Sequence, residues 1–364
     1  MERSTSRILT THAGSLPRTK ALVEMQVHRS RREPVDAAAL EREVEAATRR
    51  VIARQLEAGI DVGNNGEQPR ESFLTYVQHR MSGFAGTSQR PIMRDIVQYP
   101  SFLALKLPEF SRTMVSLMNA PKAVAPVRYA DRSPVERECA DYARILAEHP
   151  SRFRESFMSA ASPGIIAAAM ANDYYASDDE YVRAVADALT VEYETIVAQG
   201  LVLQIDAPDL AMERHTAFAD RPLDDFLDAV DRNVAAINHA LARIPSERVR
   251  LHVCWGNYEA PHTLDVPLEA LLPRLYQARV GALVVSMANP RHAHEYRCFT
   301  RHPLPAGMLL IAGVIDPTTN YVEHPEVVAD RIELAARAVG DPHRVLAGTD
   351  CGFDTAAGLG EVAE

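Results

Sequence analysis

The chain has 364 residues, of which 47% are hydrophobic, and a formal net charge of −10. This length suits one large barrel or two domains, and the acidic balance without a block rich in Lys and Arg argues against a nucleic-acid partner. No apolar run approaches the roughly 20 residues of a membrane helix, and the first residues lack the apolar core of a secretory signal. Four cysteines are too few for a disulfide framework, so we expect a cytoplasmic protein.

One unit recurs along the chain: a helical pattern, a glycine and a short apolar run. The pattern predicts helices over residues 36–58, 177–199, 266–280 and 325–339. Asp36 stands at an N-cap position, and Ser177 with Glu180 has the spacing of a capping box. We expect a left-handed cap from the glycine that follows each helix, namely Gly59, Gly200, Gly281 and Gly340.

Apolar runs without alternation indicate strands that are buried on both faces of a parallel sheet. Several of the eight strand-like runs in the sequence are of this kind; the eight lie at residues 8–15, 59–66, 157–163, 201–207, 249–255, 282–288, 309–315 and 344–350. Eight strands with intervening helices predict a single (β/α)8 barrel over residues 1–364. Residues 68–156 are too long for one crossover, so we interpret them as an insertion after strand two, with helices and a small hairpin.

The last predicted strand is followed by little further sequence, since only 13 residues come after Cys351. A closed barrel has a helix at this position. We therefore expect either that the last helix is not part of this sequence or that another subunit covers the position, which leaves a homo-oligomer open.

Polar residues gather where the predicted strands end, which is where the active sites of such barrels lie. They include His12, Ser15, Arg18, Asn65, Glu67, Arg70, Asp206, Asp209, His252, Cys254, Ser286, Asn289, His292, Asp316 and Cys351. A buried apolar run has no packing reason to end in such residues. This distribution predicts one functional site at the barrel mouth.

Three of these residues have the chemistry of metal ligands. His252 and Cys254 lie two apart on one face of strand five, and Cys351 can reach the same point from strand eight. One His and two thiolates suit Zn²⁺ and leave a fourth position open. The alternative is a buried Cys pair that packs as two small hydrophobes. Cys139 and Cys298 lie in helical or loop sequence, and we do not expect them to be ligands.

A set of motifs in one order runs through nearly the whole chain. It comprises TTHAGSLPR, GEQPR, YYASDDEY, LQIDAPDLA, HVCWGN, ANPRHAHE, GVIDPTTNYVEHPE and TDCGF. In this the chain resembles the catalytic barrel of cobalamin-independent methionine synthase, and more closely its single-barrel relatives, which include epoxyalkane:coenzyme M transferases. The synthase's N-terminal barrel, which helps to hold polyglutamylated folate, has no counterpart here.

The resemblance implies a zinc-dependent transfer of a methyl or other alkyl group to a small thiol such as homocysteine. Zinc would hold the thiol as a thiolate that attacks an alkyl carbon. The donor would be a methyl-folate, a methylated corrinoid protein or another methylated metabolite. By motif, His252, Cys254 and Cys351 match the metal ligands, and Ser15, Glu67 and Asp206 match residues that contact the thiol substrate.

Other residues of these motifs are candidates for the pocket. His12 stands where a proton donor to a leaving group would lie, so we assign it, with Asp206, a catalytic role; a structural histidine is the alternative. Trp255 follows a metal ligand and either walls the pocket or simply packs in the core. The further substrate-binding candidates are Arg70, Asp209, Ser286, Asn289 and His292, and His294 and Tyr174 are possible lining residues.

The chain departs from the methionine synthases at two points. Their fourth zinc ligand, a Glu after strand six, is replaced by Ser286, so water or substrate would fill that position unless Glu259 or Asp350 does. Their IDEPAL is IDAPDL here, the single-barrel pattern. Both departures weaken the case for homocysteine as acceptor.

Three other functions stay open at this point. The first is an epoxide:thiol transferase that forms a C–S bond. The second is a zinc alcohol dehydrogenase-like oxidoreductase, although no GxGxxG follows any predicted strand. The third is a non-catalytic relative that binds a ligand.

Overall fold

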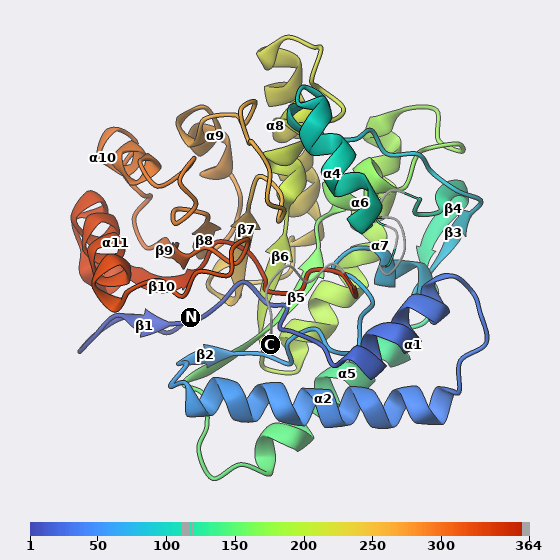
Figure 1. Cartoon of the computed structure of the whole chain (residues 1–364), viewed down its shortest axis with the longest axis horizontal. Coiled ribbons are helices and arrows are strands. Elements are labelled where there is room, and N and C mark those ends of the chain that lie inside the picture. Colours follow the sequence, from blue (N-terminus) through green and yellow to red (C-terminus); the bar gives the residue numbers. More distant parts are fainter. Residues whose placement is uncertain (111–114, 116, 118, 359–364) are drawn as a thin grey trace.

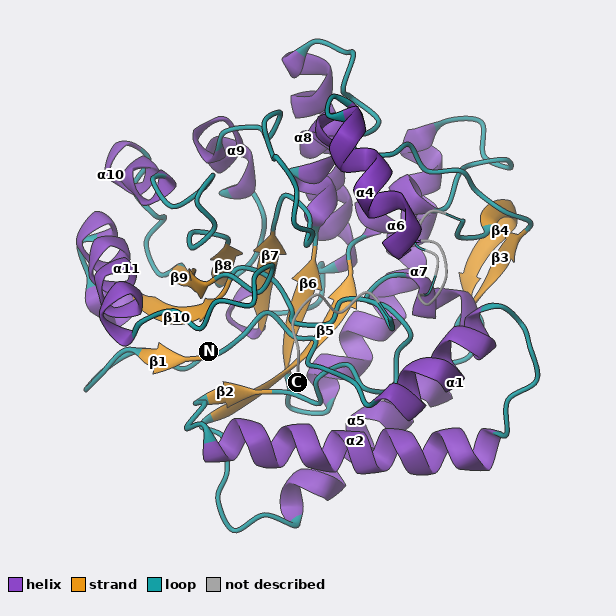
Figure 2. Cartoon of the chain, viewed as in Figure 1, coloured by secondary structure: helices purple, strands orange, loops and turns teal. Residues whose placement is uncertain are grey.

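The fold is that of a computed structural model, which describes residues 1–110, 115, 117 and 119–358. Eight parallel strands form one sheet in the order β1-β10-β9-β8-β7-β6-β5-β2, with the helices arranged around it (Figures 1 and 2). In chain order the strands are β1 (Leu9–Thr10), β2 (Val62–Gly63), β5 (Glu155–Ala161), β6 (Val202–Asp206), β7 (Val249–Val253), β8 (Ala282–Val285), β9 (Leu309–Ile315) and β10 (Val345–Thr349). The predicted (β/α)8 barrel is confirmed.

The barrel closes between β1 and β2, the two ends of this strand order. The Asp61 amide donates to the carbonyl oxygen of Thr10 at 3.1 Å, and the Thr11 hydroxyl donates to that of Val62 at 2.8 Å. These bonds join β1 and β2, although each of the two strands is only two residues long. The closed arrangement brings the carboxyl ends of all eight strands to one mouth.

Several strands end earlier than the sequence predicts, because side chains capture the backbone amides that would continue the ladder. After β2, the Gly66 and Glu67 amides donate to the Asn64 and Asn65 side chains at 2.7 and 2.9 Å. Strand β8, predicted to reach residue 288, ends at Val285, and the amides of residues 287–289 donate to the Asp350 carboxylate. Apolar runs do not reveal such captures, so the predicted boundaries were wrong at these ends.

The helices agree with the sequence wherever their caps are clear. Those of the structure are α1 (Lys20–Ser30), α2 (Ala37–Glu57), α3 (Arg94–Val97), α4 (Pro100–Phe110), α5 (Ser133–Ala147), α6 (Pro163–Ala169), α7 (Asp178–Ala198), α8 (Leu223–Ala240), α9 (Leu268–Leu275), α10 (Cys298–Arg301) and α11 (Pro325–Val339). Asp36 caps α2 and Ser177 caps α7, each by accepting a backbone N–H, as predicted. Gly59, Gly200 and Gly340 have positive φ.

The predicted helix 266–280 is the exception. It is much shorter, with Pro273 inside it, and ends at Leu275. Gly281 is therefore not the cap of this helix, and its φ is not positive. A Cβ on Gly281 would lie 2.8 Å from the carbonyl oxygen of Ser246, so a close backbone approach explains the glycine.

The insertion after strand two contains the predicted helices and hairpin. Its hairpin pairs β3 (Met81–Ala85) with β4 (Lys122–Tyr129) in antiparallel register, side by side in Figure 1, and α3 and α4 come between them in the sequence. By contrast, α5 contacts α2 and α7 as a helix of the barrel ring. The predicted end of the insertion at residue 156 stays a prediction.

The residues after β10 run back across the barrel mouth. The Phe353 amide donates to the Ser15 carbonyl oxygen at 2.9 Å, and the Ala357 amide donates to that of Glu71 at 2.8 Å. Within the described part of the chain, no helix follows β10. Residues 359–364 lie outside the described residues, and the expectation of a covering subunit stays a prediction.

The barrel interior changes from apolar to polar toward the mouth. One buried apolar cluster fills the lower part: Leu9, Val62, Phe157, Val202, Ala282, Val284, Leu309, Ile311 and Leu346. Above it, β6 and β7 pair Gln204 with Arg250 and Asp206 with His252. Because side chains alternate along a strand, the inward positions place polar groups in layers that end at the mouth. No described helix is long and apolar enough to cross a membrane.

Candidate metal and substrate site

His252, Cys254 and Cys351 form one buried group at the mouth. Their potential ligand atoms, one from each residue, all lie within 4.8 Å of one another. His252 is part of β7, Cys254 follows that strand, and Cys351 follows β10. The strand topology thus brings together two segments 97 residues apart, and the group is suitable for a metal ion.

Both imidazole nitrogens of His252 lie within hydrogen-bond distance of an oxygen atom. Its Nδ1 lies 3.0 Å from Asp206 Oδ1, and its Nε2 lies 3.1 Å from the carbonyl oxygen of Asp350. Burial alone would lower the pKa of His252, but the hydrogen bond to Asp206 and the charge of Cys254 raise it to about 9. A carboxylate on one imidazole nitrogen fixes the orientation of the ring, and a metal ion would replace the proton and the Asp350 carbonyl contact at the other nitrogen.

The two sulfur atoms interact directly. A hydrogen bond from the Cys351 thiol lowers the pKa of Cys254 to about 7, and the positive charge of His252 acts in the same direction. The same contact raises the pKa of Cys351 well above its ordinary value. One thiolate therefore forms easily, whereas the second needs a cation nearby. This donor set fits a soft or borderline divalent metal.

The candidate fourth ligands do not complete this group. Asp350 accepts hydrogen bonds from the backbone amides of Met287, Ala288 and Asn289 at 2.7–3.1 Å. Glu259 is exposed and does not line the cavity described below. Ser286 donates to the carbonyl oxygen of Asp350 at 3.0 Å, the same atom that His252 approaches.

Glu67 and Asp206 lie beside the metal group. Glu67 is buried in a left-handed backbone conformation, with φ of 57°, and accepts a hydrogen bond from Ser159 Oγ at 2.6 Å. Its other oxygen, Oε2, has no hydrogen-bond partner. Burial and the charge of Asp206 raise the pKa of Glu67 to about 7. Two buried carboxyl groups with a free oxygen form a site for a cationic group.

Gly14 leaves room for Glu67 at this point. A Cβ on Gly14 would lie 2.6 Å from Glu67 Oε1, and the φ of Gly14 is +135°. Ser15, the next residue, lines the cavity with Ala13. The THAGS motif thus provides both the close approach and a hydroxyl.

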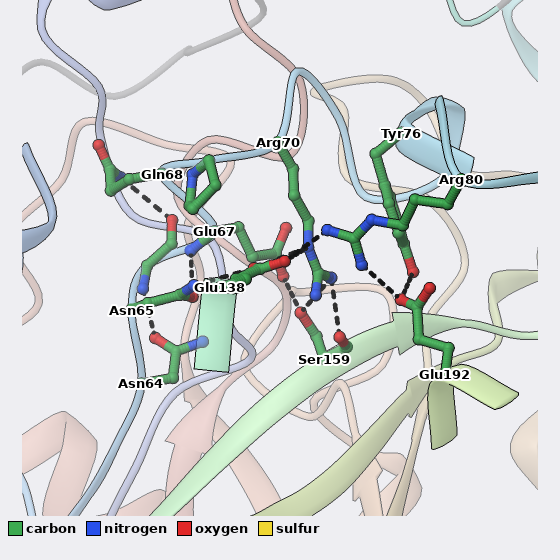
Figure 3. A network of polar contacts seen from close by, with 12 residues as sticks. Asn64, Asn65, Glu67, Gln68, Arg70, Tyr76, Arg80, Glu138, Ser159 and Glu192 are labelled. Atoms are coloured by element: carbon green, nitrogen blue, oxygen red, sulfur yellow. Dashed lines mark hydrogen bonds and ion pairs between the residues drawn. The ribbon is translucent and has the colours of Figure 1, made fainter. Parts of the chain in front are cut away.

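Arg70 does not line the cavity but belongs to the buried network behind Glu67 (Figure 3). Its guanidinium pairs with Glu138 on α5 at 3.0 Å and donates to the Ser159 carbonyl oxygen at 2.7 Å. Arg80 connects Glu138 to Glu192, on α7, through ion pairs of 2.5 and 3.0 Å. This geometry favours a positioning role for Arg70 over direct contact with a substrate.

Asp209 and His12 are also buried outside the cavity lining. Asp209 accepts hydrogen bonds from Ser162, the N-cap of α6, and from Asn233 at 2.9 Å. Both nitrogens of His12 are engaged, since Nε2 lies 2.9 Å from Gln55 Oε1 and Nδ1 accepts from the Gly14 amide. Burial lowers the pKa of His12 to about 4. These contacts favour the structural alternative for His12.

Four other predicted residues, Trp255, Ser286, Asn289 and His292, line a second, small cavity of about 20 Å³. Cys351 also borders it, so the two cavities share a metal-group residue. Trp255 stacks on the His292 ring with 3.9 Å between centroids and donates to the Val266 carbonyl oxygen at 2.7 Å. Trp255 is therefore held firmly next to Cys254.

A cluster that the sequence did not predict connects the insertion to the residues around His292. Asp95 of α3, His215 and Asp265 place potential ligand atoms within 4.8 Å of one another. Asp265 also accepts from His292 Nε2 at 2.8 Å, while the buried His215 lies 3.4 and 3.5 Å from the two aspartates. No regular spacing relates these residues, so the sequence carries no signal for the cluster.

The main cavity, of about 240 Å³, opens above the metal group. Ser15, Glu67, Asp206, His252, Cys254 and Cys351 line its floor. Its walls include apolar side chains of the insertion that were not predicted as site residues. The sequence placed the insertion near the pocket but could not show which of its side chains face inward.

Comparison with known proteins gives this geometry a context. The family described as "Cobalamin-independent synthase, Catalytic domain" matches residues 8–99. A methionine synthase of Sulfolobus acidocaldarius is 23% identical over 346 residues, which cover 94% of this chain and 85% of that protein. A 2-hydroxypropyl-CoM lyase of Xanthobacter autotrophicus is 26% identical over 148 residues, which cover 34% of this chain and 39% of the lyase.

Solved structures have the same fold. A B12-independent methionine synthase of Shewanella, in complex with selenomethionine, superimposes with a TM-score of 0.71 at 20% identity, covering 96% of this chain and 91% of that one. A putative one from Listeria monocytogenes gives 0.65 at 16% identity, covering 97% and 94%. The chain is thus a (β/α)8 barrel with a buried His/Cys/Cys group. It is similar to the cobalamin-independent methionine synthase catalytic domain, as the sequence motifs predicted.

Proposed function

We propose that this protein is a zinc-dependent alkyl transferase that accepts the alkyl group on a small thiol. The observation that carries the proposal is the buried group of His252, Cys254 and Cys351 on the floor of a cavity large enough for small molecules. When bound there, zinc supplies a positive charge that keeps a thiol deprotonated near neutral pH. The two cysteines and the histidine would hold it, with the fourth position left for a ligand from solution.

The residues around the group have separate tasks in this proposal. Asp206 orients His252 through the 3.0 Å contact with its Nδ1. Glu67 and Asp206 together receive a positive charge on the thiol substrate, and Ser15 offers a hydroxyl beside them. A thiol that carries an ammonium group, such as homocysteine, would place its sulfur at the metal and its ammonium group at the two carboxylates. The four free cysteines agree with a reducing compartment, and we infer a cytoplasmic location.

Metal analysis joined to an alkylation assay tests the proposal. We expect about one zinc per chain, loss of most of it in Cys254→Ser and Cys351→Ser, and no loss in Cys298→Ser, whose buried cysteine lies on α10 outside the group. Thioether formation should follow zinc content, measured by mass spectrometry with homocysteine as acceptor. Equal zinc content in all variants would refute the assignment of the ligands.

A further inference from the structure

The main cavity has two chemically distinct parts. Its floor carries the metal group and the two carboxyl groups, whereas its outer wall comes largely from the insertion. Six apolar side chains form that part of the wall: Phe73, Ile92, Met93, Ile96, Leu103 and Leu117. A pocket of this kind excludes water above the reacting atoms and binds apolar surface at about 25 cal/mol per Å² buried.

Positive charge is scarce along this wall. Apart from His252 of the metal group, Arg90 is the one basic side chain among the described lining residues. The guanidinium of Arg90 forms an ion pair with Glu213, and both side chains are almost fully buried, while Arg90 Nε has no hydrogen-bond partner. An anionic ligand in the outer part would have to compete with Glu213 for this cation or give up its hydration without a charged partner, which is costly.

The volume adds a second restriction. At about 240 Å³, the main cavity lies below the roughly 300–1,000 Å³ typical of ligand pockets. A methyl-folate carries an anionic glutamate tail, for which the described wall offers only Arg90, already paired with Glu213. The acceptor thiol already occupies part of the floor.

We propose that the alkyl donor of this protein is a small, uncharged molecule with an apolar body, bound against the wall formed by the insertion. This inference rests on the proposed function and names the class of its second substrate. The thiolate sulfur forms the new C–S bond with its own electron pair. The bond from that carbon to the leaving atom breaks, and the leaving atom keeps the pair and takes a proton from solvent. The thiol has released one proton, so the reaction yields a thioether and a protonated leaving group.

The test uses an inert probe, butylbenzene, which lacks a leaving group, and its anionic counterpart 4-butylbenzoate. The insertion offers a matched pair of variants, since Leu103 lines the cavity and Leu105, on the same helix α4, is 66% exposed. Isothermal titration should show that wild type binds butylbenzene more tightly than 4-butylbenzoate. Leu103→Lys should weaken the binding of butylbenzene at least tenfold and strengthen the binding of 4-butylbenzoate. Leu105→Lys should change the affinity for neither probe.

A second variant guards against misfolding of the first. Ile92 also lines the cavity but is 44% exposed, so Ile92→Lys should fold and show the same reversal of preference. The proposal is overturned if both lining variants bind butylbenzene as wild type does, or if wild type binds 4-butylbenzoate or 5-methyltetrahydrofolate at least as tightly. Because probe binding needs neither zinc nor turnover, failure of the metal assignment gives a different result: no thioether, with probe binding retained.

Discussion

At the scale of single residues, the site depends on side chains whose ordinary properties are changed by burial. Glu67 is the clearest case, because its free oxygen and its pKa of about 7 come from burial beside Asp206. A carboxyl group with a raised pKa is neutral below that value and charged above it. It can therefore receive an ammonium group only as the pH rises through its pKa.

This gives a prediction for substrate discrimination. The preference for homocysteine over 4-mercaptobutyrate, which lacks the ammonium group, should increase as the pH rises through about 7. A bound metal ion lowers the pKa of Glu67, so in the loaded protein the increase falls at or below that pH. Competitive binding from pH 5 to 9 measures the preference, and Glu67→Gln should make it independent of pH. A preference that is flat in wild type would contradict the role of Glu67.

Ser286 supports a second prediction at this scale. It lies next to the metal group, since its hydroxyl and His252 approach the same carbonyl oxygen of Asp350. Ser286→Glu should add a carboxylate ligand and slow zinc exchange with a chelator by about tenfold or more, whereas Ser286→Ala should leave it close to wild type. Unchanged exchange in Ser286→Glu would show that the side chain cannot reach the metal.

At the scale of elements, buried charges fasten the barrel ring and the insertion to the strand ends. Glu138, on α5, joins Arg70 after β2 to Arg80 at the start of the hairpin (Figure 3). Removing one partner of a buried pair leaves an uncompensated charge, at a cost of about 3–5 kcal/mol. Glu138→Gln should lower the free energy of unfolding by this amount in urea. Glu136→Gln, on the exposed face of α5, should cost under about 1 kcal/mol.

The Asp95 cluster makes a similar connection for the outer part of the insertion. Asp95→Asn removes a carboxylate that faces the buried His215 and should loosen α3 from the barrel. We expect faster limited proteolysis within residues 86–120, with the barrel intact. The control is Asp220→Asn, which breaks only the exposed ion pair between Asp220 and Arg94, the residue before Asp95. Equal proteolysis rates would show that the cluster does not hold α3 in place.

At the scale of the whole molecule, buried carboxylates whose pKa is lowered, such as Glu138, predict sensitivity to acid. Burial alone would raise the pKa of Glu138, but Arg70 and Arg80 lower it to about 2. A lowered pKa contributes stability that is present above the unfolded value, near 4.5, and is lost as the pH falls toward 2. A shift of this size corresponds to about 3 kcal/mol. Unfolding midpoints in urea should therefore drop below pH 4.5, and the drop should be smaller in Glu138→Gln.

The sequence by itself determined the elements and the chemistry at their ends. Caps such as Asp36 and Ser177, and apolar runs between glycines, depend on local conformation, so they can be read along the chain. The ligand types His252, Cys254 and Cys351 and the strand-end carboxylates could be identified in the same way. Strand alternation and the shared barrel mouth grouped the three ligand types, and the family resemblance implied the same group.

Only the tertiary structure decided which strand-end residues share a cavity. Arg70, Asp209 and His12 stand at strand ends like Glu67, yet their side chains contact Glu138, Asn233 and Gln55 and lie outside the lining. The apolar wall and the Asp95 cluster join segments that are distant along the chain, and no periodicity relates them. Side-chain direction after a strand ends is set by long-range packing and hydrogen bonds, which a local pattern does not contain.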